Sequence, residues 1–453
     1  MMKLMEKQKL KIDIRKQGIN GEGIGYFNRV AVFVPGAIRK EVVHCEVEKV
    51  YDQYAVAKLI DIERPSKKRV MPPCKYMEEC GRCELQHIEY NEQLKIKQLI
   101  LEQSFKRYTS LNDVKSKVDL TINDRNVFNY STYQELVIRN TNFGIALGYY
   151  KPHTNQFIYI EDCMVQHQEI NHIAKFALKL FRKYKMKAYD LRNQEGTLHY
   201  LVIRYFKDTD QASVVIVVNK ETSHLKRIAD EMVQTFKSIQ SVGVTMHHPE
   251  SHSVIYHPVN LLAGVLTLNT KYHQHLLGIS IDGTYPNHDE TYQMVEQAII
   301  KQTGLSIDDV VLDLFDGSTI SSIYFSNYAE KVYAIDYAAS SIKDGIDNCR
   351  RLGIENIEFI QDHVEAALPK LLKQITQPLT VVIHASKHGL SKTVIDLLNK
   401  YKVDQVVYLS QNPSSLAKDV DMLMGQYHIS KVIPVDYYPQ TARIDSITFL
   451  NKR

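Results

Sequence analysis

Three of the six cysteines of this chain fall within ten positions, a density that could serve a metal centre. Cys74, Cys80 and Cys83 follow a C-x5-C-x2-C pattern. Thiolates at this spacing can converge on one soft metal ion or on an iron–sulfur cluster. A fourth ligand must come from elsewhere, and we expect Cys163, which follows a strand-like run at an acidic turn.

The spacing leaves the kind of metal centre open. Four thiolates suit zinc as well as a [4Fe–4S] cluster. Scattered structural thiols are the other interpretation, and the crowding of the three cysteines argues against it. The two remaining cysteines, Cys45 and Cys349, stand in a strand pattern and a helix pattern, so we interpret them as packing residues.

Length, composition and charge indicate an ordinary globular protein. The 453 residues are 44% hydrophobic and 24% charged, enough for roughly two to four domains. No apolar run approaches the length needed to cross a bilayer, and residues 1–7 lack a signal-peptide pattern, so we expect a cytoplasmic protein without a membrane partner. The net charge of +4 does not by itself argue for nucleic acid.

The hydrophobic pattern along the chain predicts the strands and helices on which these residues lie. Short alternating β-branched stretches at 8–62, broken by Gly and Asn, predict a small β-barrel. A basic linker at 65–73 leads to the cysteines, and helical periodicity follows at 91–108. Strands and helices then alternate over 125–285, as in an α+β domain.

The last third of the chain predicts a different architecture. From residue 290 helices alternate regularly with apolar strands, which favours a doubly wound, mostly parallel Rossmann-like sheet with its ligand at the carboxyl ends of the early strands. We therefore predict a multidomain α/β protein. Its domains are a barrel at 1–64, a central α+β domain with the cysteines at 65–285, and the Rossmann-like domain at 286–453.

These features together resemble the SAM-dependent RNA uracil-5-methyltransferases over essentially the whole chain. The resemblance is carried by five stretches of sequence, which are 32–37, the cysteine run with Gly81 and 85–87, 313–317, 408–419 and 436–441. It implies that the barrel is an RNA-binding TRAM domain, that the RNA is rRNA or tRNA, and that the last domain binds SAM. It also implies that Cys74, Cys80, Cys83 and Cys163 hold a [4Fe–4S] cluster, with zinc as the alternative.

The resemblance points to a lost catalytic nucleophile. In the family a cysteine thiolate of a Ser-Cys-Asn-Pro motif adds to C6 of uracil and thereby activates C5. This chain has Gln411 at that position, and a glutamine amide cannot make the addition. Loss of a covalent nucleophile can cost up to roughly 10⁶ in kcat. The family's glutamate base is shortened to Asp445, so the resemblance leaves no intact catalytic residue.

Motifs around the expected cofactor also differ from those of the family. The glycine-rich loop after the first strand reads Asp316-Gly317-Ser318-Thr319. A β-branched residue at the second glycine position would cost about 1–3 kcal/mol if the backbone there needs a positive φ. Gly317 remains, and Asp336 ends the second strand, where an acidic residue binds ribose hydroxyls. These two are the candidate SAM-binding residues.

Two further family motifs are changed. The Asp-Pro-Pro-Arg motif after the fourth strand begins with His384 here, and the Phe-Gln-x-Asn stretch has Pro286 and His288 in place of its two amides. The first hypothesis is therefore an RNA-binding family member that has lost cysteine-dependent 5-methyluridine formation. The second is an active SAM-dependent methyltransferase with altered chemistry or target, using Asp316 and Asp445. The third is an iron–sulfur redox sensor that binds RNA; a cluster that only stabilises the fold is favoured over it.

Overall fold

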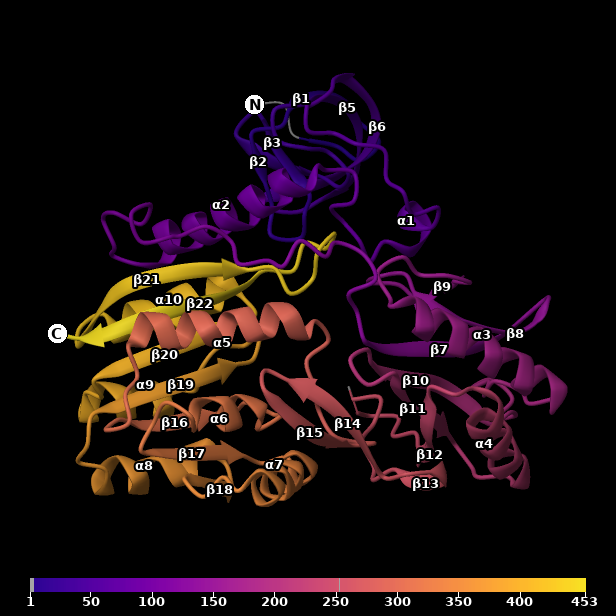
Figure 1. Cartoon of the computed structure of the whole chain (residues 1–453). Coiled ribbons are helices and arrows are strands. Elements are labelled where there is room, and N and C mark those ends of the chain that lie inside the picture. The colour runs from indigo at the N-terminus through magenta and orange to yellow at the C-terminus, as the bar shows by residue number, and fades with distance from the viewer. Residues whose placement is uncertain (1–3, 252) are drawn as a thin grey trace. The chain divides into compact units, whose positions relative to one another are not determined.

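The computed structural model describes residues 4–251 and 253–453 (Figure 1). Contacts divide the chain into two compact units. The first unit consists of Met1–Asn123, Ala385–Leu390 and Leu409–Thr448, and the second of Asp124–His384, Ser391–Tyr408 and Phe449–Arg453. Among the described residues, no helix is both long and apolar enough to span a membrane.

The N-terminal segment folds into one six-stranded sheet. Its order is β1-β5-β6-β4-β3-β2. The alternating apolar residues of these strands face a common core that includes Ile12, Val32 and Val43. Residue 25 must be glycine because a Cβ there would lie 2.1 Å from Ile12 Cγ2, so β1 and β3 approach closely. The strands are β1 (Lys9–Asp13), β2 (Lys16–Gln17), β3 (Gly23–Phe27), β4 (Val30–Val34), β5 (Val42–Val50) and β6 (Tyr54–Arg64).

The predicted barrel is thus present as a curled sheet that does not close completely. Register shifts in the β5–β6 pairing bend the sheet, as β-bulges do. The edges are β1 and the two-residue β2, and the described strands show no ladder that joins them.

Two helices follow the sheet in the first unit. The one-turn helix α1 (Met77–Cys80) ends at Gly81, which has φ 66° and donates its N–H to Met77 O. This left-handed cap explains the glycine between Cys80 and Cys83. The long helix α2 (Tyr90–Tyr108) packs against α10 (Pro413–Leu423) and β21 (Tyr427–Val435).

A seven-stranded sheet forms the central part of the second unit, in the order β13-β12-β11-β10-β7-β8-β9. Helices α3 (Gln168–Lys183) and α4 (Ser223–Thr235) pack against it (Figure 1). The hairpin of β14 (Thr267–Tyr272) and β15 (His275–Ser280) follows. The sheet strands are β7 (Tyr133–Thr141), β8 (Gly144–Tyr150), β9 (Phe157–Tyr159), β10 (Leu198–Phe206), β11 (Gln211–Val218), β12 (Ile239–Met246) and β13 (Asn260–Gly264).

The C-terminal third confirms the predicted doubly wound sheet. Its strands follow the order β18-β17-β16-β19-β20-β22-β21. The elements are α5 (Asp289–Thr303), β16 (Val310–Leu314), α6 (Ile320–Phe325), β17 (Lys331–Asp336), α7 (Ala339–Leu352), β18 (Ile357–Gln361), α8 (Val364–Gln374), β19 (Leu379–Ala385), α9 (Lys392–Tyr401), β20 (Gln405–Ser410), α10, β21 and β22 (Asp445–Lys452). Strand β16 pairs in parallel with β17 on one side and β19 on the other. The strand order therefore reverses between β16 and β19, where open α/β sheets bind their ligands.

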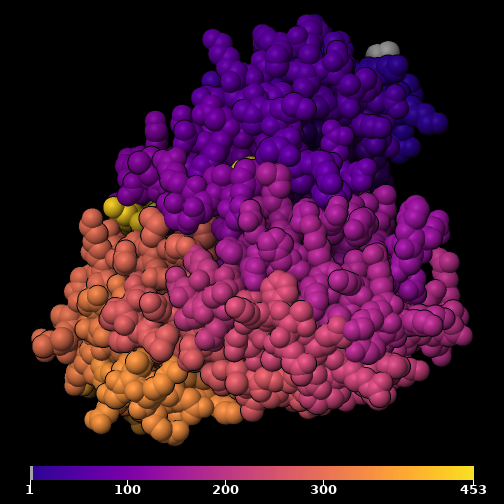
Figure 2. All heavy atoms as spheres, turned by 45° about the vertical axis from the view of Figure 1, so that its right-hand side comes forward, coloured from indigo at the N-terminus to yellow at the C-terminus, as the bar shows by residue number. Residues whose placement is uncertain are grey.

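One hydrophobic cluster within the second unit joins residues on both sides of position 285. Tyr272 and Tyr285 share it with Ile320 and Ile323 of α6. On the face drawn in Figure 2, the atoms coloured magenta to orange lie in contact without a visible gap. The domain limits at 64 and 285 stay predictions.

A candidate cofactor and active site

His384 lies between two aspartates at the point where the strand order reverses. Its Nε2 is 3.1 Å from Asp313 Oδ1 and its Nδ1 is 3.8 Å from Asp316 Oδ1. Asp313 is on β16, Asp316 follows that strand, and His384 is near the end of β19. The parallel pairing of the two strands brings the three side chains together.

Hydroxyl groups from α5 and α6 complete this group, which we call the switch-point cluster. Tyr292 OH donates to Asp316 Oδ1 at 3.1 Å and lies 3.5 Å from His384 Nδ1. Ser322 Oγ donates to Asp313 Oδ2 at 2.6 Å. The cluster consists of Asp313, Asp316, His384, Tyr292 and Ser322.

Burial and mutual charge shift the pKa values in the switch-point cluster. Burial, together with repulsion from Asp313, raises the pKa of Asp316 to about 6. Burial opposes the charged form of His384, but attraction to Asp316 and Asp313 outweighs it and raises the pKa of His384 to about 9. The imidazole is therefore a cation at neutral pH, in contact with two carboxylates.

A second buried carboxylate lies further along α5. Glu296 Oε2 accepts a hydrogen bond from Tyr272 OH at 2.7 Å and lies 2.7 Å from His273 Nε2. Burial raises the pKa of Glu296. The ring of His273 stacks on Tyr324 with centroids 3.8 Å apart. Helix α5 thus presents Tyr292 and Glu296, one turn apart, to the interior of the second unit.

The loop between β16 and α6 adopts the backbone expected of a cofactor loop. Phe315, Gly317 and Thr319 have φ of 62°, 69° and 59°. Thr319, the β-branched residue at the second glycine position, therefore has a positive φ. This left-handed backbone carries a strain of about 1–3 kcal/mol. Thr319 Oγ1 donates to Ser341 O at 3.0 Å, which ties the loop to α7.

Gly317 and Asp336, the two predicted SAM-binding residues, are in direct contact. The N–H of Gly317 donates to Asp336 Oδ2 at 2.9 Å, and the N–H of Ala338 donates to Asp336 Oδ1 at 2.8 Å. A carboxylate has about four acceptor positions, so lone pairs remain for ribose hydroxyls. A Cβ added at Gly317 would meet nothing within 4 Å, so one face of the loop is open.

Gln411 occupies an exposed turn of the first unit. It follows β20 and precedes Asn412, which caps α10 by accepting the N–H of Ser414 at 2.9 Å. The Asn412 amide also donates to Lys387 O at 3.1 Å. The turn is therefore held by its neighbours, and the Gln411 side chain points to the surface.

Asp445 differs from Gln411 in being buried. Burial raises the pKa of Asp445 to about 6, and the nearby Arg443 and Lys97 oppose the rise. The Arg443 guanidinium lies 3.7 Å from the centroid of the Tyr438 ring. A carboxylate that titrates this close to neutral pH can accept or release a proton in a reaction.

The segment after the cysteines braces the loop that precedes Asp445. The N–H of Leu85 donates to Gln440 O at 2.9 Å, and the N–H of Ala442 donates to Glu84 Oε2 at 3.1 Å. Nearby, Lys97 Nζ forms an ion pair with Asp436 Oδ1 at 2.6 Å, and both side chains are fully buried.

The predicted cysteine ligands lie in both units. Cys74, Cys80 and Cys83 are half-buried in the first unit, and Cys163 is half-buried in the second. The amide of Asn171 holds Cys163 through its backbone N–H and carbonyl, both at 3.0 Å. The four-cysteine centre stays a prediction.

Polar groups beside the cysteine run fit a sulfur-rich centre. The N–H of Cys74 donates to Gln86 Oε1 at 3.3 Å. In the described part of the chain, Gln86 Nε2 and both ring nitrogens of His87 are buried without a hydrogen-bond partner. Burial lowers the pKa of His87 to about 4, so the ring is neutral. Buried N–H donors beside cysteines are the groups that hydrogen-bond to cluster sulfurs.

Comparison with known proteins decides the family. A model described as tRNA (Uracil-5-)-methyltransferase matches residues 89–453, and a TRAM domain model matches residues 3–60. The chain belongs to the tRNA (uracil-5-)-methyltransferase family. A Listeria innocua relative named as an uncharacterized RNA methyltransferase is 31% identical over 99% of this chain and 98% of its own length. A Bacillus cereus relative with the same description is 29% identical over 100% and 98%.

A solved structure shares the fold of this uracil-5-methyltransferase family member. It is the Pyrococcus abyssi tRNA (uracil-54, C5)-methyltransferase in complex with S-adenosyl-L-homocysteine, with a TM-score of 0.76. It covers 97% of this chain and 100% of its own, at 20% identity. The predicted fold, from the TRAM domain to the Rossmann-like domain, is thereby confirmed.

Sequence reasoning identified part of the switch-point cluster of this family member. Motif comparison singled out Asp316 and His384 separately, but it did not pair them or find Tyr292 and Ser322, and it did not find Glu296 further along α5. Strand alternation alone could have placed residues 313 and 384 at neighbouring strand ends. The residues on α5 carry no local signal, because their role depends on which way that helix packs.

Proposed function

We propose that this chain is an RNA-binding member of its family that no longer makes 5-methyluridine through a cysteine adduct. The observation that carries the proposal is Gln411, an amide on the exposed turn between β20 and α10 where the family motif has its nucleophile. An amide nitrogen has no lone pair basic enough to add to C6 of a pyrimidine. The TRAM match supports RNA binding, with tRNA or rRNA as the target.

The cofactor side supports retained binding of SAM. Gly317 and Asp336 form the contact expected of a cofactor loop, and the switch-point cluster carries one cation against two carboxylates at neutral pH. A site with excess negative charge favours the SAM sulfonium cation. SAM would supply the methyl group, while the chain would hold its ribose through Asp336.

The cysteines support a cluster that stabilises the fold. Cys74, Cys80, Cys83 and Cys163 would hold a [4Fe–4S] cluster, with zinc as the alternative, and Gln86 and His87 would surround it with N–H donors. A cluster supplies a rigid cross-link when all four ligands are protein thiolates. Iron and sulfide analysis of anaerobically purified protein, with a Cys80→Ser control, distinguishes the two metals.

The test of the main proposal has separate binding and chemistry readouts. RNA binding is measured by fluorescence anisotropy with unmodified tRNA and rRNA fragments over a range of salt concentrations. Methyl transfer is measured by mass spectrometry of the same RNA after incubation with SAM. We expect salt-dependent binding and no 5-methyluridine. Formation of 5-methyluridine at ordinary turnover would refute the loss, and absence of RNA binding would refute the retained function.

The buried carboxylates favour a second candidate function. Burial raises the pKa of both Asp316 and Asp445 to about 6, which suits general bases near neutral pH. A target atom of the RNA that is more nucleophilic than uracil C5 could be methylated with the help of such a base and without a cysteine adduct. The same mass spectrometry detects this activity as a methylated nucleoside other than 5-methyluridine.

A further inference from the structure

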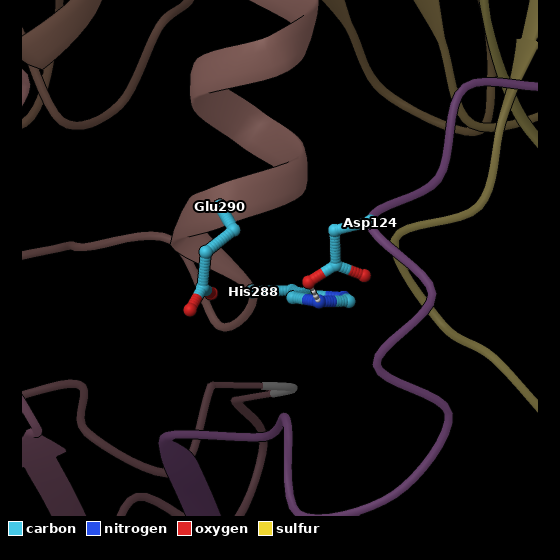
Figure 3. Close-up of side chains that lie close together, drawn as sticks. All are labelled: Asp124, His288 and Glu290. Carbon is cyan, nitrogen blue, oxygen red and sulfur yellow. Dashed lines mark hydrogen bonds and ion pairs between the residues drawn. The ribbon is translucent and has the colours of Figure 1, made fainter.

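Asp124, His288 and Glu290 bring three potential metal ligands together in the second unit (Figure 3). One ligand atom from each lies within 4.8 Å of the other two. Asp124 precedes the central sheet, whereas His288 and Glu290 flank the first residue of α5. In Figure 3 the Asp124 carboxylate lies against the His288 imidazole, and the Glu290 carboxylate lies to the left of this pair.

The two innermost ligands already have the separation that a bound ion requires. His288 Nε2 lies 2.8 Å from Asp124 Oδ2, and the two side chains are 1% and 8% exposed. Ligand atoms that bind one ion at about 2.1 Å and a right angle are about 3 Å apart. An ion bound by both atoms at about 2.1 Å would displace the proton between them and lie off the Nε2–Oδ2 line, so the two side chains would have to rotate toward it.

Glu290 supplies an oxygen that a cation could bind. One oxygen, Oε1, pairs with Lys207 Nζ. In the residues that the structure describes, the other oxygen, Oε2, is buried and accepts no hydrogen bond. A carboxylate oxygen without a protein hydrogen-bond partner is satisfied by an ordered water or by a bound cation.

The charged side chains around the site have an excess of negative charge. Asp124, Asp289 and Glu290 are three carboxylates, and Lys207 is the ammonium that pairs with the last two. The three carboxylates and the one ammonium sum to two negative charges. A divalent ion would neutralise them.

Neighbouring residues already orient both inner ligands. The Asn126 amide donates to Asp124 Oδ2 at 2.7 Å. The Tyr130 ring stacks on His288 with centroids 4.6 Å apart and an interplanar angle of 21°. Such surrounding contacts raise metal affinity by fixing the ligands before the ion arrives.

We propose that Asp124, His288 and Glu290 form a binding site for a divalent transition-metal ion. One imidazole and two carboxylates suit Mn²⁺ or Zn²⁺. The ion would clamp residue 124 to the start of α5, the helix that presents Tyr292 to the switch-point cluster. This site is separate from the cysteines and independent of the proposed function.

The test uses Mn²⁺ because this ion prefers oxygen and nitrogen ligands to thiolates. Free Mn²⁺ is followed by EPR during titration of the full chain. We expect one ion per chain, with the affinity reduced at least tenfold in Glu290→Gln and in His288→Asn. Glu231→Gln is the matched control, because Glu231 pairs with Lys183 as Glu290 pairs with Lys207.

Two results would overturn the site. One is the absence of stoichiometric Mn²⁺ binding by the unaltered chain, and the other is an unchanged affinity in Glu290→Gln. This variant decides the matter even if His288→Asn fails to fold, because the Glu290 side chain is 37% exposed and its change leaves the Asp124–His288 pair in place. Circular dichroism verifies that it is folded. The melting temperature gives a second readout, which Mn²⁺ should raise in the unaltered chain and leave unchanged in Glu290→Gln.

Discussion

The switch-point cluster in the second unit and the Gln411 turn in the first unit differ in how their side chains are held. In the cluster, the His384 imidazole is bound by Asp313 and Asp316. In the turn, Gln411, which we propose stands in place of the family nucleophile, is exposed. A buried position admits a new charge only with partners, whereas an exposed nucleophile can be lost without cost to the fold.

The largest expected effect is the return of covalent chemistry at the Gln411 turn. Gln411→Cys restores the thiol of the family motif, and we expect it to form an adduct with an RNA that contains 5-fluorouridine. The unaltered chain should form none, since the nucleophile accounts for up to roughly 10⁶ in rate in comparable enzymes. The adduct is detected as a band of reduced mobility on a denaturing gel.

The matched control is Gln411→Ser, which changes size and polarity without supplying a thiolate. An adduct in the unaltered chain would contradict the proposed loss. An adduct in the cysteine variant without 5-methyluridine would place the remaining defect in the other changed positions.

Breaking the buried Lys97–Asp436 ion pair should have the next largest effect, in this case on stability. Lys97→Met leaves Asp436 buried without its charged partner, although Tyr90 OH still donates to Asp436 Oδ2. Breaking a buried pair in this way costs about 3–5 kcal/mol. Urea unfolding measures the loss. In the double variant Lys97→Met, Asp436→Asn much of the stability should return, because no charge is then left unpaired. Equal loss in both variants would show that packing rather than charge dominates.

His384 should make stability depend on alkaline pH. Its pKa rises from 6.5 to about 9 in the folded chain. A raised pKa stabilises the folded state fully below the unfolded value and loses this contribution as pH rises through the folded value. The loss should approach about 3 kcal/mol between pH 6.5 and pH 10.

Urea unfolding of the unaltered chain and of His384→Asn at several pH values isolates this contribution. Tyrosines and lysines titrate in both proteins, so the difference between the two curves reports His384. Parallel curves would show that the imidazole is not charged in the folded chain. In that case the switch-point cluster would not differ from the Gln411 turn in holding a charged side chain.

The sequence predicted the C-terminal sheet better than it predicted the buried polar contacts. Strand alternation sufficed for the doubly wound sheet, because that architecture follows from local pattern. Motif positions singled out Gly317 and Asp336 separately, and the structure added the hydrogen bond between them. The Lys97–Asp436 pair joins residues 339 positions apart, and Lys97 looks like any surface lysine of a helix. Tyr292 and Glu296 were missed for the same physical reason: long-range packing, rather than local pattern, decides which polar residues of a helix are buried.

The cofactor loop should respond least to substitution. Thr319→Gly removes the Cβ from a residue with φ 59° but also removes the hydrogen bond to Ser341 O. Strain relief of about 1–3 kcal/mol is therefore offset by about 1 kcal/mol for the lost hydrogen bond, and we expect a net gain of about 1 kcal/mol in unfolding free energy. Calorimetry with S-adenosyl-L-homocysteine should show equal or tighter binding. Weaker binding in a more stable variant would mean that Thr319 contacts the cofactor. The threonine would then contribute to binding instead of only adding backbone strain.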